Sequence, residues 1–165
     1  ICKELTDYMF HLYESDNLVK DSQCPLSGSI YGNVAFDTIL KKLTGPLSEQ
    51  LGIDLDPTYT YARLYRPGEE LEKHTDRPSC EISGTMTLGF APSTSVWPIY
   101  FGENDEDLIG KEFDIDVGDL VMYLGNELPH WRTEFKGCWQ VQVFFHYVDK
   151  NGPQKEFKND KRPAV

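Results

Sequence analysis

The stretch PTYTYARLYRPGEELEKHTD, residues 57–76, decides the fold. Its first half alternates tyrosine or arginine at positions 59, 61, 63 and 65 with smaller or apolar residues, which is the period of a β-strand. The Pro-Gly pair at 67–68 ends that strand. The stretch closes on His74-Thr75-Asp76, whose outer two side chains point the same way if the chain is extended. It therefore predicts a strand that leads into two convergent polar groups.

The residues on either side of this stretch indicate an α+β domain. Apolar residues recur at helical spacing in residues 2–14, and Asn33 could cap a second helix that Gly52 ends. The Gly-Pro pair at 45–46 is expected to break or kink the second helix. Further strands are expected at 82–90, 96–101, 112–115, 119–124 and 139–148. Helices followed by short strands predict a sandwich or barrel with the N-terminal helices packed on one sheet.

The length of 165 residues suits a single domain over residues 1–148. We expect 1–56 to form a helical support and 57–148 the β-rich core. The polar residues 149–165 are predicted to be a mobile C-terminal tail. No sequence pattern indicates an oligomeric state.

The net charge is −11, from 16 basic and 27 acidic residues, which disfavours nucleic-acid partners. No apolar run approaches the roughly 18 residues of a membrane span, so no membrane partner is expected. The four cysteines are scattered without a C-x-x-C pair, which indicates reduced thiols and a cytoplasmic location. The acidic segment 103–107 is interpreted as a solvated hairpin tip.

A second histidine, His130, follows the predicted strand 119–124. An H-x-D triplet alone is common, and a loop histidine paired with Asp76 would explain it. Together, His74, Asp76 and His130 are the two imidazoles and one carboxylate with which non-haem Fe(II) oxygenases bind iron. The same set could hold Zn²⁺ in a hydrolase, with Glu81 or Glu127 as general base. A non-catalytic, cupin-like binding module is the third interpretation.

Over residues 58–148 the chain resembles the 2-oxoglutarate/Fe(II)-dependent dioxygenases, most nearly their prolyl-4-hydroxylase-like branch. The shared blocks, in order, are YRPG at 65–68, HTD at 74–76, TMTL at 85–88, WPIYF at 97–101, VGDLV at 117–121 and the distal His130. The blocks DRPSCEIS at 76–83 and LPHWR at 128–132 resemble small bacterial and phage oxygenases.

The resemblance implies a double-stranded β-helix, a jelly roll of cupin-like form, over residues 57–148. It also implies that His74, Asp76 and His130 are the catalytic residues that bind Fe(II), with 2-oxoglutarate and O₂ as cosubstrates. The implied reaction is hydroxylation of an unactivated carbon in a small-molecule or peptide substrate, such as a prolyl or other amino-acid residue. The loop 78–81 and the span 91–96 are expected to shape the entrance to the site.

One departure from the family concerns the cosubstrate. Trp139 and Gln140 stand where the family usually places the lysine or arginine that pairs with the far carboxylate of 2-oxoglutarate. Lys136 is a possible replacement, but a guanidinium binds a carboxylate through two parallel hydrogen bonds, which favours Arg132 and Arg63. Either arginine could instead be an internal ion-pair partner or a surface charge. Tyr65 matches the family's tyrosine and could contact the cosubstrate or simply line the barrel.

Overall fold

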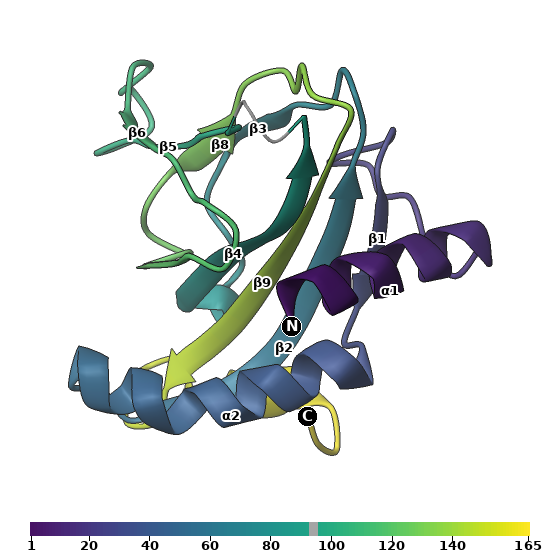
Figure 1. Cartoon of the computed structure of the whole chain (residues 1–165). Coiled ribbons are helices and arrows are strands. Elements are labelled where there is room, and N and C mark those ends of the chain that lie inside the picture. The colour runs from purple at the N-terminus through teal and green to yellow at the C-terminus, as the bar shows by residue number, and fades with distance from the viewer. Residues whose placement is uncertain (93–95) are drawn as a thin grey trace.

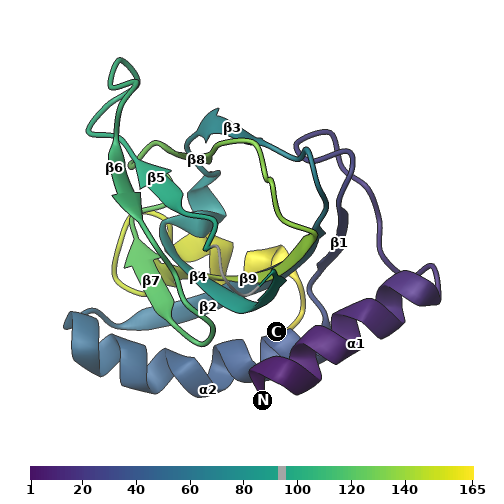
Figure 2. The same ribbon diagram turned by 45° about the horizontal axis from the view of Figure 1, so that its top comes forward.

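The computed structural model describes residues 1–92 and 96–165 and contains two antiparallel sheets that face each other (Figures 1 and 2). The five-stranded sheet has the order β1-β2-β9-β4-β7, and the four-stranded sheet has the order β3-β8-β5-β6. The elements are α1 (Cys2–Glu14), β1 (Gly28–Tyr31), α2 (Val34–Leu51), β2 (Leu55–Tyr65), β3 (Leu71–His74), η1 (Pro78–Cys80), β4 (Ile82–Ala91), β5 (Ile99–Phe101), β6 (Lys111–Phe113), β7 (Leu120–Tyr123), β8 (His130–Arg132), β9 (Trp139–Asp149) and η2 (Lys155–Lys161). Part of the span 91–96, expected to shape the entrance, lies outside the described residues.

Both N-terminal helices pack against the five-stranded sheet, as predicted (Figure 1). The Asn33 side chain caps α2 by accepting a hydrogen bond from the Ala35 N–H, and Gly52 ends the helix in the left-handed conformation, with φ +67°. The helix continues through Pro46, so the break expected there is wrong. No helix in the described part of the chain is both long and apolar enough to cross a membrane.

Strand alternation divides the five-stranded sheet into an apolar face and a polar face. Ala62 and Leu64 of β2 and Val143 of β9 belong to the core beneath the helices. The intervening residues, such as Arg63 and Gln142, are buried on the opposite face, toward the four-stranded sheet. The polar face is where a binding site can form, because its buried side chains carry hydrogen-bonding groups.

The four-stranded sheet carries two strands that the sequence pattern did not predict. Both β3 and β8 are short, and their antiparallel register sets His74 opposite His130 and Leu71 opposite Arg132. Strands of three or four residues are too short for alternation to identify them. This pairing brings the H-x-D triplet and the distal histidine together.

The C-terminal segment is not a free tail in the structure, which differs from the mobile segment expected. Arg77 donates to both carboxylate oxygens of Asp160, at 3.0 and 2.7 Å. Arg162 pairs with Asp37 at 3.0 Å, and Lys158 with Asp56 at 2.9 Å. A polar composition suggested mobility, but these charged side chains tie the segment to the rest of the domain.

Candidate metal centre

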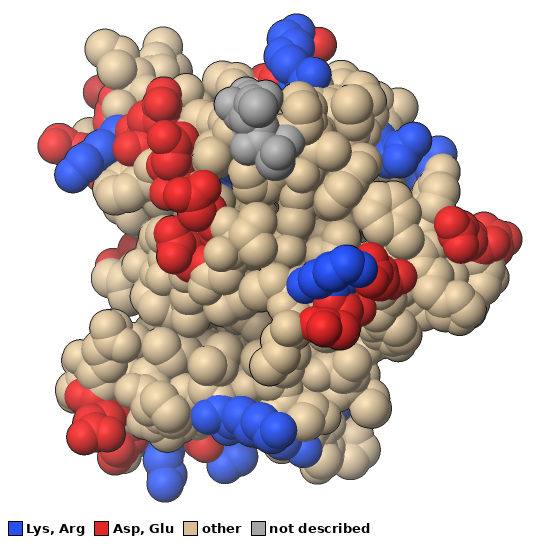
Figure 3. Space-filling model, in the orientation of Figure 1, with Lys and Arg blue, Asp and Glu red and all other residues tan. Residues whose placement is uncertain are grey.

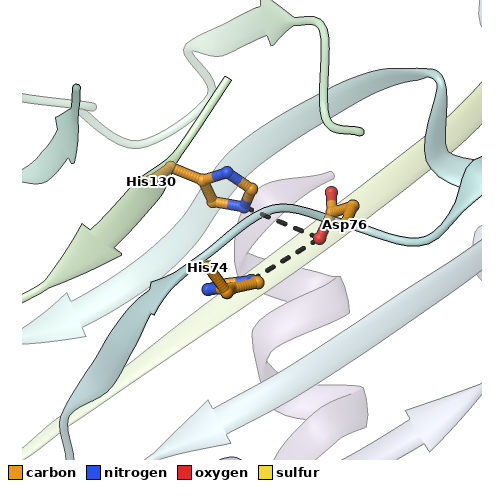
Figure 4. A group of neighbouring side chains, drawn as sticks. All are labelled: His74, Asp76 and His130. Atoms are coloured by element: carbon orange, nitrogen blue, oxygen red, sulfur yellow. Dashed lines mark ion pairs between the residues drawn. The ribbon is translucent and has the colours of Figure 1, made fainter. Parts of the chain in front are cut away.

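Three side chains from the facing edges of β3 and β8 converge on one point. His74 ends β3, Asp76 lies two residues further on, and His130 begins β8. The Asp76 Oδ1 atom is 3.5 Å from His74 Nε2 and 3.6 Å from His130 Nε2 (Figure 4). Two ligands bonded to one metal at about 2.1 Å and at right angles lie about 3 Å apart. A small inward adjustment would therefore bring all three atoms to bonding distance.

Backbone carbonyls hold both imidazoles in the orientation that a metal needs. His74 Nδ1 lies 2.8 Å from the Glu72 carbonyl oxygen, and His130 Nδ1 lies 2.9 Å from that of Leu128. If each Nδ1 carries the proton and donates it to the carbonyl, the lone pair on each Nε2 is directed toward Asp76. In that tautomer each ring is neutral and can bind a metal through its Nε2 atom.

The Asp76 carboxylate is held by its own set of contacts. Its backbone N–H donates to the Gly125 carbonyl at 2.8 Å, and the Ser83 hydroxyl donates to Oδ2 at 3.2 Å. Burial raises the pKa of Asp76, but the hydrogen bond from His74 and the nearby histidines outweigh it, so the net pKa is lowered. The carboxyl group is therefore ionised at neutral pH, and its Oδ1 atom faces the histidines.

The two histidines differ in pKa. Burial lowers the pKa of His130, which favours the neutral ring that a metal requires. Burial also lowers the pKa of His74, but the hydrogen bonds to Asp76 and to the Glu72 carbonyl outweigh it and raise the net pKa. A bound metal would take the place of the proton that His74 otherwise shares with Asp76.

Gly125 lies against the Asp76 carboxylate, and its lack of a side chain leaves room for that group. Replacing Gly125 therefore tests the packing around Asp76. A Cβ atom at position 125 would lie 2.6 Å from Asp76 Oδ2 and would also overlap Cys80 O and Ser83 Oγ. We expect Gly125→Ala to lower the free energy of unfolding by about 2–4 kcal/mol, because backbone and a buried hydroxyl must shift.

Chemical denaturation measures that loss, and Gly45 provides the matched control. Gly45 lies inside α2, directly before Pro46. Apart from its two chain neighbours and the helix backbone, no described atom lies within 4 Å of the place that a Cβ atom would take there. Gly45→Ala should therefore change the free energy of unfolding by less than about 1 kcal/mol, because the gain in helix propensity is opposed by crowding of the new Cβ atom against the ring of Pro46. Equal effects of the two substitutions would contradict the tight packing at Gly125.

A second group of possible ligands, Asp76, Cys80 and His146, lies behind the first. His146 Nδ1 is 2.9 Å from the Ser83 hydroxyl, a contact typical of a hydrogen-bonded structural histidine. The Cys80 sulfur contacts the Tyr59 hydroxyl at 2.9 Å, and burial raises the pKa of this thiol to about 12. Because a metal binds the thiolate form, the two-histidine set is the better candidate.

The candidate metal ligands open into a pocket of about 170 Å³ between the two sheets. The pocket is lined by Asp21, Gln23, Tyr59, Tyr61, Arg63, Leu71, His74, Asp76, Tyr123, His130, Phe144 and His146. The sequence did not indicate Gln23, whose amide nitrogen lies 3.2 Å from His74 Nε2. No local signal could have found it, because the chain folds back from a loop far from His74 in sequence. The place of His146 on this wall could have been inferred from strand parity with Gln142.

Arg132 is fully buried without an acidic partner. It is 0% exposed and lies two residues beyond His130, on the same side of β8. Its Nη1 donates to the Trp97 carbonyl, and its guanidinium lies over the Trp97 ring. Among the described residues, nothing pairs with its Nε or Nη2 atoms, and burial lowers its pKa to about 10. A buried cation with two unpartnered donors can bind an anion. Arg132 is not among the residues that line the pocket, so an anion that reaches it must extend beyond that lining.

Arg63, the other candidate, already has a partner. Its Nη2 atom lies 2.7 Å from Asp21 Oδ2 and 3.0 Å from Gln23 Oε1. Its Nη1 donates to the hydroxyl of Tyr65, a fully buried residue, at 3.3 Å. The structure thus places Arg63 in the pocket wall as half of an ion pair. The uncompensated charge is on Arg132.

The fold is shared with known oxygenases, although no protein family and no curated protein sequence matches the chain. A prolyl-4-hydroxylase from Pseudomonas putida is 18% identical, with 90% of this chain and 85% of that one covered and a TM-score of 0.68. The non-heme alpha-ketoglutarate-dependent epimerase SnoN from nogalamycin biosynthesis is 9% identical, with 99% and 80% covered and a TM-score of 0.71. A prolyl hydroxylase from Trichoplax adhaerens, solved with a hypoxia-inducible-factor peptide, is 14% identical, with 98% and 82% covered and a TM-score of 0.66. At these identities the likeness is one of architecture: the chain has the fold of prolyl hydroxylases and related 2-oxoglutarate-dependent enzymes.

Proposed function

We propose that this protein is an Fe(II)- and 2-oxoglutarate-dependent oxygenase built on a double-stranded β-helix. The observation that carries the proposal is the convergence of His74 Nε2, Asp76 Oδ1 and His130 Nε2 at the wall of the pocket. Two imidazoles and one carboxylate occupy one face of an octahedral Fe(II) and leave the other positions open. The solved structures that share the fold support this assignment.

Arg132 is our candidate for binding the far carboxylate of 2-oxoglutarate. Two residues along a strand span about 6.6 Å, so His130 and Arg132 are separated by a distance comparable with the length of this five-carbon dianion. The free Nε and Nη2 atoms of Arg132 supply the two donors that a carboxylate needs. Tyr65 and Arg63, whose side chains contact each other, would form the adjoining wall.

Within this proposal the chain's own residues hold, orient and shield the reactants. Bound Fe(II), with 2-oxoglutarate and O₂, would supply the oxidising chemistry that hydroxylates an unactivated carbon. His74, Asp76 and His130 would fix the metal, and Arg132 would fix the cosubstrate. The aromatic walls formed by Tyr59, Tyr123 and Phe144 would limit access of water to the pocket.

The substrate class is also part of the proposal. Prolyl hydroxylases among the structures of this fold support a prolyl, peptidyl or amino-acid substrate, while the epimerase shows that the same scaffold serves other substrates. The net charge of −11 argues against a nucleic-acid substrate. The four free thiols are compatible with the cytoplasmic location expected from the sequence.

The zinc-hydrolase alternative lacks a base in the right place. Glu81 accepts a hydrogen bond from the Asp149 N–H at 2.9 Å, and neither Glu81 nor Glu127 lines the pocket. A hydrolase would need one of these carboxylates near the water bound to the metal. The positions of both residues therefore favour the oxygenase.

Release of succinate from 2-oxoglutarate tests the proposed function. Protein supplied with Fe(II), 2-oxoglutarate and air should form succinate slowly even without a primary substrate, and Zn²⁺ should not replace Fe(II). His74→Ala should abolish this turnover, because it removes one of three metal ligands. Equal succinate formation by the wild-type protein and His74→Ala would overturn the assignment.

A further inference from the structure

A second cavity lies between the free edges of the two sheets, outside the metal pocket. This edge groove has a volume of about 340 Å³. Its walls come from β5, β6 and β7 and from the segments that follow β5 and precede β8. The groove is lined by Phe101, Gly102, Glu103, Lys111, Phe113, Val121, Met122, Tyr123 and Leu128. Most of these side chains are apolar, so the groove suits an apolar side chain of a ligand.

The strands beside the edge groove each have one unpaired edge. Strand β6 ends the order of the four-stranded sheet and β7 ends that of the five-stranded sheet, within the described residues. The two strands lie on the same side of the molecule (Figure 2). An unpaired edge offers backbone N–H and C=O groups to another extended chain, which is how strand addition binds peptides. This feature favours a polypeptide over a small molecule.

The charge of the chain is concentrated around the same groove. Residues 103–127 contain nine of the acidic residues and a single lysine, so they carry −8 of the net −11. Acidic side chains gather on the side of the molecule where β6 lies (Figure 3). The exposed carboxylates of this stretch are those of Glu103, Asp105, Glu106, Glu112, Asp114, Asp116, Asp119 and Glu127. Such a field attracts a cationic partner and repels an anionic one.

The hairpin beside the groove is held in place by internal contacts. The Lys73 ammonium donates to the carbonyl oxygens of Asn104, Asp105 and Asp107, at 2.6–3.0 Å. Leu108 and Ile109 come directly after this segment in sequence. Their side chains are 83% and 86% exposed, respectively. The solvated hairpin tip expected from the sequence thus also presents apolar surface next to an apolar groove.

We propose that this face docks an extended cationic segment of a polypeptide substrate. The main chain of the segment would pair with the β6 or β7 edge, an apolar side chain would enter the groove, and its lysines or arginines would meet the carboxylates. The substrate role rests on the proposed oxygenase function: Tyr123 lines both the groove and the metal pocket, and its ring centroid is 4.8 Å from that of His130. A segment docked here would lie beside the metal site.

Binding of labelled decapeptides, followed by fluorescence anisotropy, tests the docking surface. The first peptide alternates lysine with valine, the second has glutamate for each lysine, and the third has serine for each valine. A fourth repeats the first with alternate backbone nitrogens methylated, which removes the donors for strand pairing. We expect only the first peptide to bind tightly. Equal binding of the glutamate or the N-methylated peptide would overturn the proposal.

Protein variants locate the binding to this face. The triple variant Glu103→Gln, Asp114→Asn, Asp116→Asn should weaken binding of the first peptide about tenfold, because three attractive charges are lost. The matched control neutralises the exposed carboxylates Glu14, Glu49 and Glu156 to glutamine and should change affinity less than about twofold. Equal losses in the two triple variants would show binding to overall charge and would contradict a docking site.

Two further variants separate the contributions to docking. Leu108→Ser combined with Ile109→Ser alters exposed side chains only and should weaken binding severalfold without affecting the fold. Arg132→Met should leave peptide binding unchanged, because it alters the proposed cosubstrate site alone. If succinate formation fails while these peptide results hold, the docking surface stands and only its role in substrate recognition falls. If binding survives both the triple and the Leu108/Ile109 variants, the docking proposal is wrong.

Discussion

Replacing Arg132 with methionine is expected to weaken 2-oxoglutarate binding by about a hundredfold while Fe(II) binding is retained. The expected loss corresponds to about 2.7 kcal/mol, the scale of a bidentate charge-assisted contact in a buried site. Methionine has a similar length and no charge, so the packing around position 132 changes little. Isothermal titration of 2-oxoglutarate into protein loaded with Fe(II) under anaerobic conditions measures the loss.

The same substitution should stabilise the ligand-free protein. Arg132 is fully buried with two unpartnered nitrogen atoms in the described structure, so its charge is not compensated. Removing such a charge relieves a desolvation cost of several kcal/mol, against the loss of its hydrogen bond to Trp97. We expect the free energy of unfolding to rise by about 1 kcal/mol. A fall of similar size would indicate an internal partner for Arg132 and contradict its proposed role.

Arg63→Met is the matched control for Arg132. Arg63 is also buried, but it pairs with Asp21 at 2.7 Å, and its removal leaves that carboxylate without its cationic partner. We therefore expect Arg63→Met to destabilise the protein by about 2–4 kcal/mol. A loss of stability on replacing Arg63 and a gain on replacing Arg132 would show that Arg63 belongs to an internal ion pair and that Arg132 has a free charge for an anion.

Metal binding should distinguish His130 from His146, each of which lies near Asp76. His130→Ala removes one of three ligands and is expected to lower Fe(II) affinity more than about a hundredfold. Loss of a residue that only hydrogen-bonds to a metal ligand would cost less. His146→Asn alters the second group of candidate ligands and preserves a polar partner for Ser83, so it should retain Fe(II) within about tenfold. Equilibrium dialysis under anaerobic conditions compares them. The reverse order would assign the metal to Asp76, Cys80 and His146.

The sequence could predict the features that depend on local pattern. The β2 alternation, the Asn33 cap and the terminal Gly52 each follow from a few neighbouring residues, and all three are present in the structure. The convergence of His74, Asp76 and His130 was also expected, and the structure brings their ligand atoms together. That they bind a metal stays a proposal.

Long-range partners could not be predicted in the same way. Nothing in the residues around Arg63 indicates that Asp21 folds back to pair with it, while Arg132 is left without an acid. The polar composition of the C-terminal segment predicts mobility, because the ion pair between its Asp160 and Arg77 joins residues far apart in sequence. The edge groove likewise exists only after two sheets end side by side.

The central claim is that this site binds Fe(II) and 2-oxoglutarate together. Its most direct test is a visible absorption titration of anaerobic Fe(II)-loaded protein with 2-oxoglutarate, which follows the charge-transfer band of a 2-oxo acid chelated to Fe(II). The band should appear with the wild-type protein, saturate at one 2-oxoglutarate per iron, and be absent with His130→Ala. Wild-type protein that holds Fe(II) but shows neither this band nor 2-oxoglutarate binding would contradict the claim.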